Sequence, residues 1–203
     1  MLKQIINKLF YNPYKFIKKH SNIKVSDTVI LLKSCTFRFD GKVKNNKVSI
    51  GDNSMVGCSF VFESDEGEIN VGNNSYIGGG TTLISRNNIS IGNNVTIAWG
   101  CTLYDHNSHS LDYIERQKDI ERQNDDYRNG RNFISSKDWS VVKSKPIIIE
   151  DNVWICFDSV ILAGVTVGEG SIIGARSVVR HNVEPWTVVA GNPAVVIKRL
   201  RDE

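Results

Sequence analysis

The chain has 203 residues, which is enough for one domain with a buried core. Hydrophobic residues make up 40% and charged residues 23%, and a net charge of +3 is too small to indicate a nucleic-acid partner. The four cysteines form no pair at zinc-site spacing, and no apolar run approaches the roughly 18 residues of a membrane span. Without the features of a secretory signal, the sequence predicts a cytoplasmic protein with free thiols and no metal.

Residues 1–22 are rich in lysine, contain no acidic residue and interleave the cations with apolar residues. The pattern resembles two short amphipathic basic helices that are broken near Pro13. Such a segment can contact a membrane surface or an acidic glycan, or it can cover the end of the domain that follows. We prefer the second interpretation and assign residues 1–47 to a partly helical N-terminal cap, with a weak membrane-surface contact as the alternative.

From residue 48 onward, a branched or aromatic apolar residue recurs at every sixth position. The longest series is Ile149, Ile155, Ile161, Val167, Ile173 and Val179, and shorter series are Ile50, Val56, Phe62; Val71, Ile77, Leu83, Ile89; and Ile91, Ile97, Leu103. Tetrads recur in the same phase: IGDN at 50–53, VGNN at 71–74, IGNN at 91–94, IEDN at 149–152 and VGEG at 167–170. A period of six is neither the roughly 3.6-residue period of a helix nor the alternation of a surface strand.

This period indicates short strands separated by sharp corners, with one inward apolar side chain on each flat face. β-Branched residues suit a buried strand, and Gly or Asn suits a corner because both tolerate a positive φ. Three faces close one coil of about 18 residues, and successive coils stack at roughly 4.8 Å. The sequence therefore predicts an all-β solenoid over residues 48–189, followed by a C-terminal tail at 190–203.

Two histidines stand close together in LYDHNSHSLD at residues 103–112, where a series of hexads ends. A histidine at the rim of a solenoid can remove a proton from a hydroxyl near neutral pH. The same stretch can instead be a polar surface turn. A shared metal ion would need a third imidazole, which only His20 or His181 could supply.

Residues 112–145 interrupt the hexads with seven acidic and eight basic residues. A long, nearly neutral loop that carries aromatic residues is typical of a functional segment. Aromatic faces suit sugar rings, and the candidates for such contacts are Tyr113, Tyr127, Phe133 and Trp139. The loop can instead hold neighbouring subunits together.

Four features together resemble the hexapeptide-repeat acetyltransferases: the hexads, SHSLDYIER (108–116), the run 147–179 and AGNPAVVIKRL (190–200). The resemblance covers about residues 48–200, and the segment 137–155 is most similar to the bacterial capsule and surface polysaccharide O-acetyltransferases. It implies a left-handed parallel β-helix that forms a homotrimer, with active sites between subunits and acetyl-CoA as co-substrate. The handedness comes from the resemblance, because left-handed crossovers are exceptional.

The resemblance also implies roles for single residues. His109, in His109-Ser110-Leu111-Asp112, matches the family's general base, and His106 would be an accessory or acceptor-binding residue. The implied cofactor contacts are Trp154, Ala175, Arg176, Arg180 and Lys198. The expected substrate contacts are Arg86, Asp105 and Trp139.

The sequence departs from the family pattern at several of these positions. Cys156 stands where the family has Gly, Arg176 stands where Gly is frequent, and Arg180-His181 replaces Thr-Lys. The acidic and amide side chains that hold the sugar in the galactoside enzymes have no counterpart, because Gly78 and Arg86 occupy those approximate places. The acceptor is therefore not expected to be a galactoside of that kind.

We expect direct transfer of an acetyl group to a hydroxyl of a sugar or polysaccharide, with His109 as the general base. N-acyl transfer to an amino sugar or nucleotide sugar is the main alternative. A γ-type carbonic anhydrase fits poorly because it needs three zinc imidazoles. A non-catalytic trimer that binds glycans is the remaining possibility.

Overall fold

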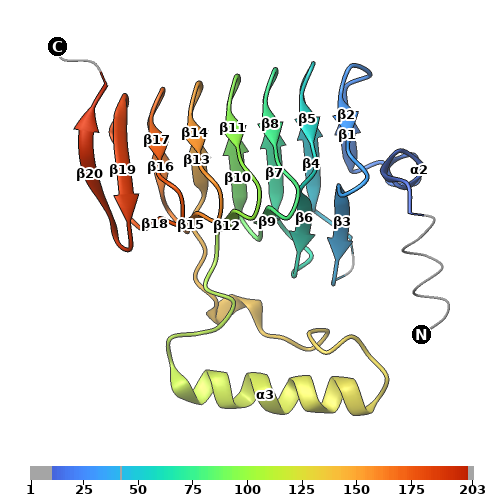
Figure 1. Ribbon diagram of the computed structural model, residues 1–203. Helices are drawn as coiled ribbons and strands as arrows, with labels where there is room; N and C mark the ends of the chain where they lie inside the picture. The colour runs from blue at the N-terminus through green and yellow to red at the C-terminus, as the bar shows by residue number, and fades with distance from the viewer. Residues whose placement is uncertain (1–10, 42, 201–203) are drawn as a thin grey trace.

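The computed structural model describes residues 11–41 and 43–200. Most strands lie in three parallel sheets, and each turn of the chain adds one strand to each sheet, so the domain is a parallel β-helix (Figure 1). This arrangement is consistent with the left-handed β-helix that the resemblance implies. None of the helices in the described ranges is long and apolar enough to cross a membrane.

The strands fall into sheets A, B and C. Sheet A contains β1 (Ile23–Val25), β4 (Lys47–Ile50), β7 (Glu68–Val71), β10 (Asn88–Ile91), β13 (Ile147–Ile149) and β16 (Thr166–Val167). Sheet B contains β2 (Ile30–Leu31), β5 (Met55–Val56), β8 (Tyr76–Ile77), β11 (Thr96–Ile97), β14 (Trp154–Ile155), β17 (Ile172–Ile173), β19 (Thr187–Gly191) and β20 (Ala194–Arg199). Sheet C contains β3 (Thr36–Phe39), β6 (Ser59–Phe62), β9 (Thr82–Ile84), β12 (Thr102–Tyr104), β15 (Val160–Leu162) and β18 (Val178–Val179).

The hexad residues form the core. Ile77 pairs in register with Ile97, and Ile97 pairs with Ile155, so one face of sheet B is a continuous apolar ladder. All three side chains are fully buried. The period of six therefore places one apolar side chain per face inside the helix, as the sequence predicts.

The corners between sheets A and B use the tetrads. In four of the five tetrads the fourth residue is an asparagine with positive φ, and Gly170 takes that place in the fifth; the asparagines are Asn53, Asn74, Asn94 and Asn152. The third residue links coils, since Oδ1 of Asn93 accepts the N–H of Asn73 at 2.9 Å and Oδ1 of Asp151 accepts the N–H of Asn93 at 2.8 Å. The tetrads therefore supply both the tight turn and a ladder of hydrogen bonds along the corner.

The solenoid is longer at both ends than the sequence analysis assigned. Strand β1 pairs with β4 from Ile23 onward, so the first coil lies inside the segment 1–47 that we assigned to the cap. At the other end, β19 and β20 form an antiparallel hairpin that extends sheet B, where we expected a tail. Backbone pairing at the sheet edge explains why both segments are ordered into strands.

A short helix, α2 (Pro13–Ile17), lies beside the first coil (Figure 1). Its N-cap Asn12 accepts the N–H of Lys15 at 3.1 Å. Phe16 stacks on Phe37 at 5.6 Å, and Phe37 stacks on Phe60 at 4.9 Å, so an aromatic column continues from α2 into the coils. The first of the two helices predicted for residues 1–22 falls mainly on residues 1–10, which lie outside the described residues, so the full cap stays a prediction.

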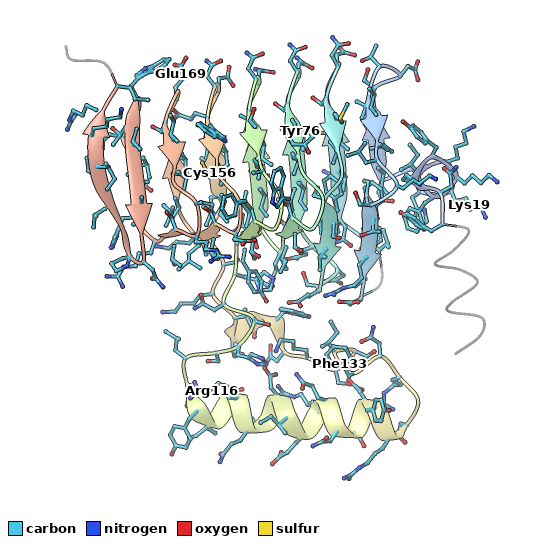
Figure 2. The ribbon with its side chains drawn as sticks, in the orientation of Figure 1. Lys19, Tyr76, Arg116, Phe133, Cys156 and Glu169 are labelled. Atoms are coloured by element: carbon cyan, nitrogen blue, oxygen red, sulfur yellow. The ribbon has the colours of Figure 1, made fainter. Side chains whose placement is uncertain are left out.

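The chain leaves the solenoid after β12 and returns at β13, and we call residues 105–145 the arm. The arm contains α3 (Tyr113–Arg128) and the 3-10 helix η1 (Trp139–Val141). Helix α3 runs alongside the coils at the corner between sheets C and A, which we call the C–A corner (Figure 1). Figure 2 shows Arg116 near the start of α3 and Phe133 on the returning segment. The sequence analysis predicted an extruded loop here but not its long helix.

A pair of substitutions tests the role of the corner asparagines. Asn94 is exposed and has φ of 56°, so Asn94→Ala should lower the free energy of unfolding by about 1 kcal/mol, because alanine lacks the short polar side chain that lets asparagine tolerate this conformation. Asn94→Gly should change it by less than about 0.5 kcal/mol. Denaturant unfolding of both variants measures the difference, and equal losses would contradict this account of the corner.

Candidate active site

The arm is fixed at its base by a short antiparallel pairing. The N–H of Asn107 donates to the carbonyl of Lys143 at 3.1 Å, and the N–H of Lys145 donates to the carbonyl of Asp105 at 2.9 Å. A bridge between His106 and Ser144 lies between these two bonds. The residues around both histidines are therefore held against the solenoid.

Asp105 stabilises the adjacent corner of the preceding coil. Its carboxylate accepts hydrogen bonds from Ser85 Oγ at 2.7 Å, from the N–H of Arg86 at 2.8 Å and from the N–H of Asn87 at 2.9 Å. Burial raises the pKa of Asp105 although these donors act in the opposite direction. The side chain is fully buried, so the structure does not support the expected substrate contact at Asp105: its acceptor atoms already bind backbone donors.

His106 is also buried, with 3% of its surface exposed. Its Nδ1 accepts the N–H of Ser108 at 3.1 Å, and its ring packs edge-on against Tyr104 and Trp139. Burial, followed by the nearby charges of Arg86 and Lys137, lowers the pKa of His106 to about 4. His106 is therefore neutral near pH 7 and carries its proton on Nε2.

Trp139 joins the arm to the corner. The guanidinium of Arg86 lies 5.7 Å from the centre of its ring, and Nζ of Lys137 lies 5.2 Å from it. Cations at these distances are attracted to the electron-rich face of an indole. The structure thus brings together two of the expected substrate residues, Arg86 and Trp139, beside His106.

His109 is half-exposed at the edge of the same cluster, with 44% of its side chain accessible. Its Nδ1 lies 3.0 Å from Oδ2 of Asp119, a residue of α3. Within the described part of the chain, Nε2 of His109 has no hydrogen-bond partner. Nζ of Lys137 also lies 3.4 Å from Nδ1, but the carboxylate is closer and favours the tautomer that carries its proton on Nδ1 and leaves a free lone pair on Nε2.

Asp119 is held in place by a buried lysine. Nζ of Lys137 lies 2.5 Å from Oδ2 of Asp119, and both side chains are almost completely buried. Burial raises the pKa of Asp119, but hydrogen bonds from Lys137 and His109 outweigh it, so the pKa is lowered overall. Asp119 stays ionised at neutral pH, and its charge is balanced by that of Lys137.

The sequence analysis missed three residues of this cluster: Asp119, Lys137 and Glu63. Asp119 and Lys137 gave no signal because each was one of many charged residues in the segment 112–145. Glu63 follows a buried strand at a C–A corner, and its Oε2 accepts the hydroxyl of Tyr104 at 3.1 Å. Their roles depend on contacts between residues far apart in the chain.

The implied cofactor contacts lie elsewhere, on coils that follow the arm. Trp154 on β14 is 48% exposed, and Arg176 lies in a corner where it approaches Asp158 at 3.5 Å. Ala175, Arg180 and Lys198 are also exposed. Among the described residues, no recorded side-chain contact joins this surface to the cluster around His109. These residues present an aromatic face and several cations, and no group of described residues is arranged to hold a metal ion.

Residues 146–181 match the family described as bacterial transferase hexapeptide (six repeats). A segment of 59 residues is 52% identical to 2,3,4,5-tetrahydropyridine-2,6-dicarboxylate N-acetyltransferase of Staphylococcus aureus, covering 29% of this chain and 25% of that protein. The chain spans less than a third of the length of the curated relatives that it matches first. The match to the hexapeptide transferase family therefore falls on the coils that follow the arm.

Two solved structures resemble almost the whole chain. A hexapeptide-repeat acetyltransferase from Vibrio cholerae, complexed with acetyl-CoA, is 26% identical with a TM-score of 0.57, and the match covers 93% of this chain and 76% of that one. The N-acyltransferase AntD from Bacillus cereus, in complex with dTDP and 3-hydroxybutyryl-CoA, has a TM-score of 0.67 at 19% identity, covering 95% and 90%. The second likeness is one of fold alone.

The buried state of His106 predicts a dependence of stability on pH. The pKa of His106 is lowered to about 4 in the folded protein, so the imidazole is protonated at a higher pH in the unfolded chain than in the folded one. Stability is therefore lost as the pH falls from about 6.5 towards 4. The loss should approach about 3 kcal/mol. In His106→Asn, Oδ1 can still accept the N–H of Ser108, but this contribution disappears. Denaturant unfolding at several pH values should therefore give a flatter curve for the variant, and parallel curves would contradict the prediction.

Proposed function

We propose that this protein transfers an acetyl group from acetyl-CoA to a hydroxyl of a sugar or surface polysaccharide. The observation that carries the proposal is the pairing of His109 Nδ1 with Asp119, which leaves Nε2 free on a half-exposed ring. This is the arrangement that a general base needs. The hexapeptide-transferase coils and the acetyl-CoA-bound neighbour support acetyl-CoA as the co-substrate.

In the proposed reaction, Nε2 of His109 takes the proton of the acceptor hydroxyl as its oxygen attacks the thioester carbonyl. The tetrahedral intermediate collapses with cleavage of the C–S bond, and the proton passes from His109 to the departing CoA sulfur. Asp119 stabilises the imidazolium formed between these steps, and it keeps the ring oriented. Lys137 limits the cost of burying the Asp119 charge.

Acetyl-CoA would bind along the coils after the arm. Trp154 would line the path of the pantetheine chain of the cofactor, and the backbone at Ala175 would contact that chain. The charges of Arg176, Arg180 and Lys198 would lie near the phosphates of CoA. Among the described residues of one chain, this surface and His109 are not in contact, and a homotrimer would let a neighbouring copy bring the two together. We therefore include the homotrimer in the proposal.

N-acyl transfer to an amino sugar is the second candidate. It is favoured by the segment shared with an N-acetyltransferase and by the fold shared with AntD. The same histidine could take a proton from the amino group of the acceptor as its neutral amine attacks the thioester, so the geometry around His109 serves either acceptor. The choice of O-transfer rests on the similarity of residues 137–155 to the polysaccharide O-acetyltransferases.

The activity is tested by incubating the protein with acetyl-CoA and a panel of hydroxyl-bearing and amino sugars and measuring the release of free thiol. His109→Ala should lower kcat by about 100-fold or more because the acceptor loses its base. The KM for acetyl-CoA should stay near that of the wild type. Mass and NMR analysis of the product identifies an ester or an amide, and an amide alone would overturn O-transfer while retaining acyl transfer. Undiminished turnover by folded His109→Ala would exclude His109 as the base.

Asp119→Asn tests the partner of the base. The amide can keep a hydrogen bond but cannot stabilise the imidazolium, so kcat should fall more than about tenfold with little change in the KM for acetyl-CoA. Asp125→Asn is the matched control, because Asp125 lies on the same helix, is exposed and forms an ion pair with Arg131. Equal activity of the two variants, with circular dichroism spectra like the wild type, would argue against this role of Asp119.

A further inference from the structure

A cavity of about 510 Å³ lies between the arm and the C–A corners of the first two coils. The corner wall includes Asp40, Lys44, Glu63 and Asp65, and the arm wall includes Lys137 and Trp139. Its volume is in the range of sites that hold small molecules. Both walls come from one chain, so this cavity does not depend on a neighbouring subunit.

The two cations in the cavity wall are already engaged with carboxylates. Nζ of Lys44 lies 2.8 Å from Oδ2 of Asp65, and Nζ of Lys137 lies 2.5 Å from Oδ2 of Asp119. A ligand that carries a carboxylate would have to compete with these pairs. The wall of described residues thus offers no uncommitted cation to an acidic ligand.

Glu63 has acceptor capacity to spare. It receives the hydroxyl of Tyr104 at 3.1 Å, while Arg38 lies 3.5 Å away and is closer to Asp40, at 3.0 Å. A carboxylate has about four acceptor positions, so Glu63 can still accept hydrogen bonds from a ligand. The same side chain would repel an anion, and Asp40 in the same wall would add to that repulsion.

A buried donor without a partner lies directly behind Glu63. Nε2 of His106 is 3.8 Å from Oε2 of Glu63 and makes no hydrogen bond, although the ring is almost completely buried. Since Nδ1 of this ring accepts the N–H of Ser108, the proton of the neutral ring is on Nε2. The His106 side chain is closed off from solvent, whereas that of Glu63 is 21% exposed. A ligand in the cavity can therefore reach the carboxylate of Glu63, and the neutral ring of His106 behind it adds no charge to the wall.

We propose that this cavity binds a sugar ring that carries hydroxyl or amino groups and no acidic group, with Glu63 as the carboxylate that selects it. The inference rests on the proposed function and narrows the acceptor to neutral and amino sugars, so that uronic acids are rejected. Trp139 would supply the apolar surface against which the ring packs. The selection comes from the paired cations of the wall and from the acceptor positions that Glu63 has to spare.

Ligand-detected NMR of the full chain tests this selection without acetyl-CoA. The ligands are glucose, glucosamine and glucuronic acid, and their galacto counterparts. The neutral and amino sugars should give saturation-transfer signals, with glucosamine bound more tightly, and the uronic acids should give none. Glu63→Gln should raise the Kd for glucosamine roughly tenfold, because a charge-assisted hydrogen bond is lost. Glu115→Gln removes the same charge from a partly buried site on α3 outside the cavity wall and should leave every Kd unchanged.

Ser135→Trp provides a second variant that leaves Glu63 intact. Ser135 is an exposed residue in the arm wall, so an indole there should fill the cavity and abolish binding of all the sugars. Binding of glucuronic acid as tight as that of glucosamine, or unchanged binding by the folded Ser135→Trp variant, would overturn the proposal. Failure of the proposed sugar selection can be distinguished from failure of the proposed transfer activity, because sugar binding and thiol release are measured separately.

Discussion

The stacking of one apolar side chain per face at every sixth residue constrains the whole molecule. Because Ile77, Ile97 and Ile155 pair in register, each coil has nearly the same path as the coil before it. Equivalent corners of successive coils must then lie in a row. The C–A corners place Glu63 and the 85–87 turn beside the base of the arm, although these residues are far apart in the sequence. A row of equivalent corners thus becomes the wall of a site.

The arm is organised by charge rather than by an apolar core. The buried residues of α3 are Asp119 and Asp126, and both bind groups of the returning segment. Asp126 accepts Nε of Arg131 at 2.7 Å and the N–H of Ser136 at 2.7 Å. Buried charges of this kind add little net stability, but each tolerates few alternative partners. We infer that they fix the orientation of the arm, and with it the position of His109.

Most of the solenoid could be predicted from the sequence, because the hexad period depends on local spacing alone. The first coil was missed although Val25, Leu31 and Phe37 keep the spacing, since the tetrad that follows Val25 has neither Gly nor Asn. Helix α3 was missed because its buried face is acidic, so the apolar stripe that marks an amphipathic helix is absent. His109 was named as the candidate base through its motif, whereas its partner Asp119 is set by tertiary contacts that no motif encodes.

Paired charges have two consequences at this site. The pairing of Lys137 with Asp119 lets an ionised carboxylate remain buried next to His109, as the proposed role of His109 as a general base requires. It also commits the one lysine that connects this pair to the cavity wall, so that lysine is not available to hold an acidic ligand. Under the two proposals, the strength of the base and the charge of the acceptor would both depend on Lys137. A homologous arm that selects acidic sugars would need an additional cation in the wall, because removing Asp119 to free Lys137 would also remove the partner of the base.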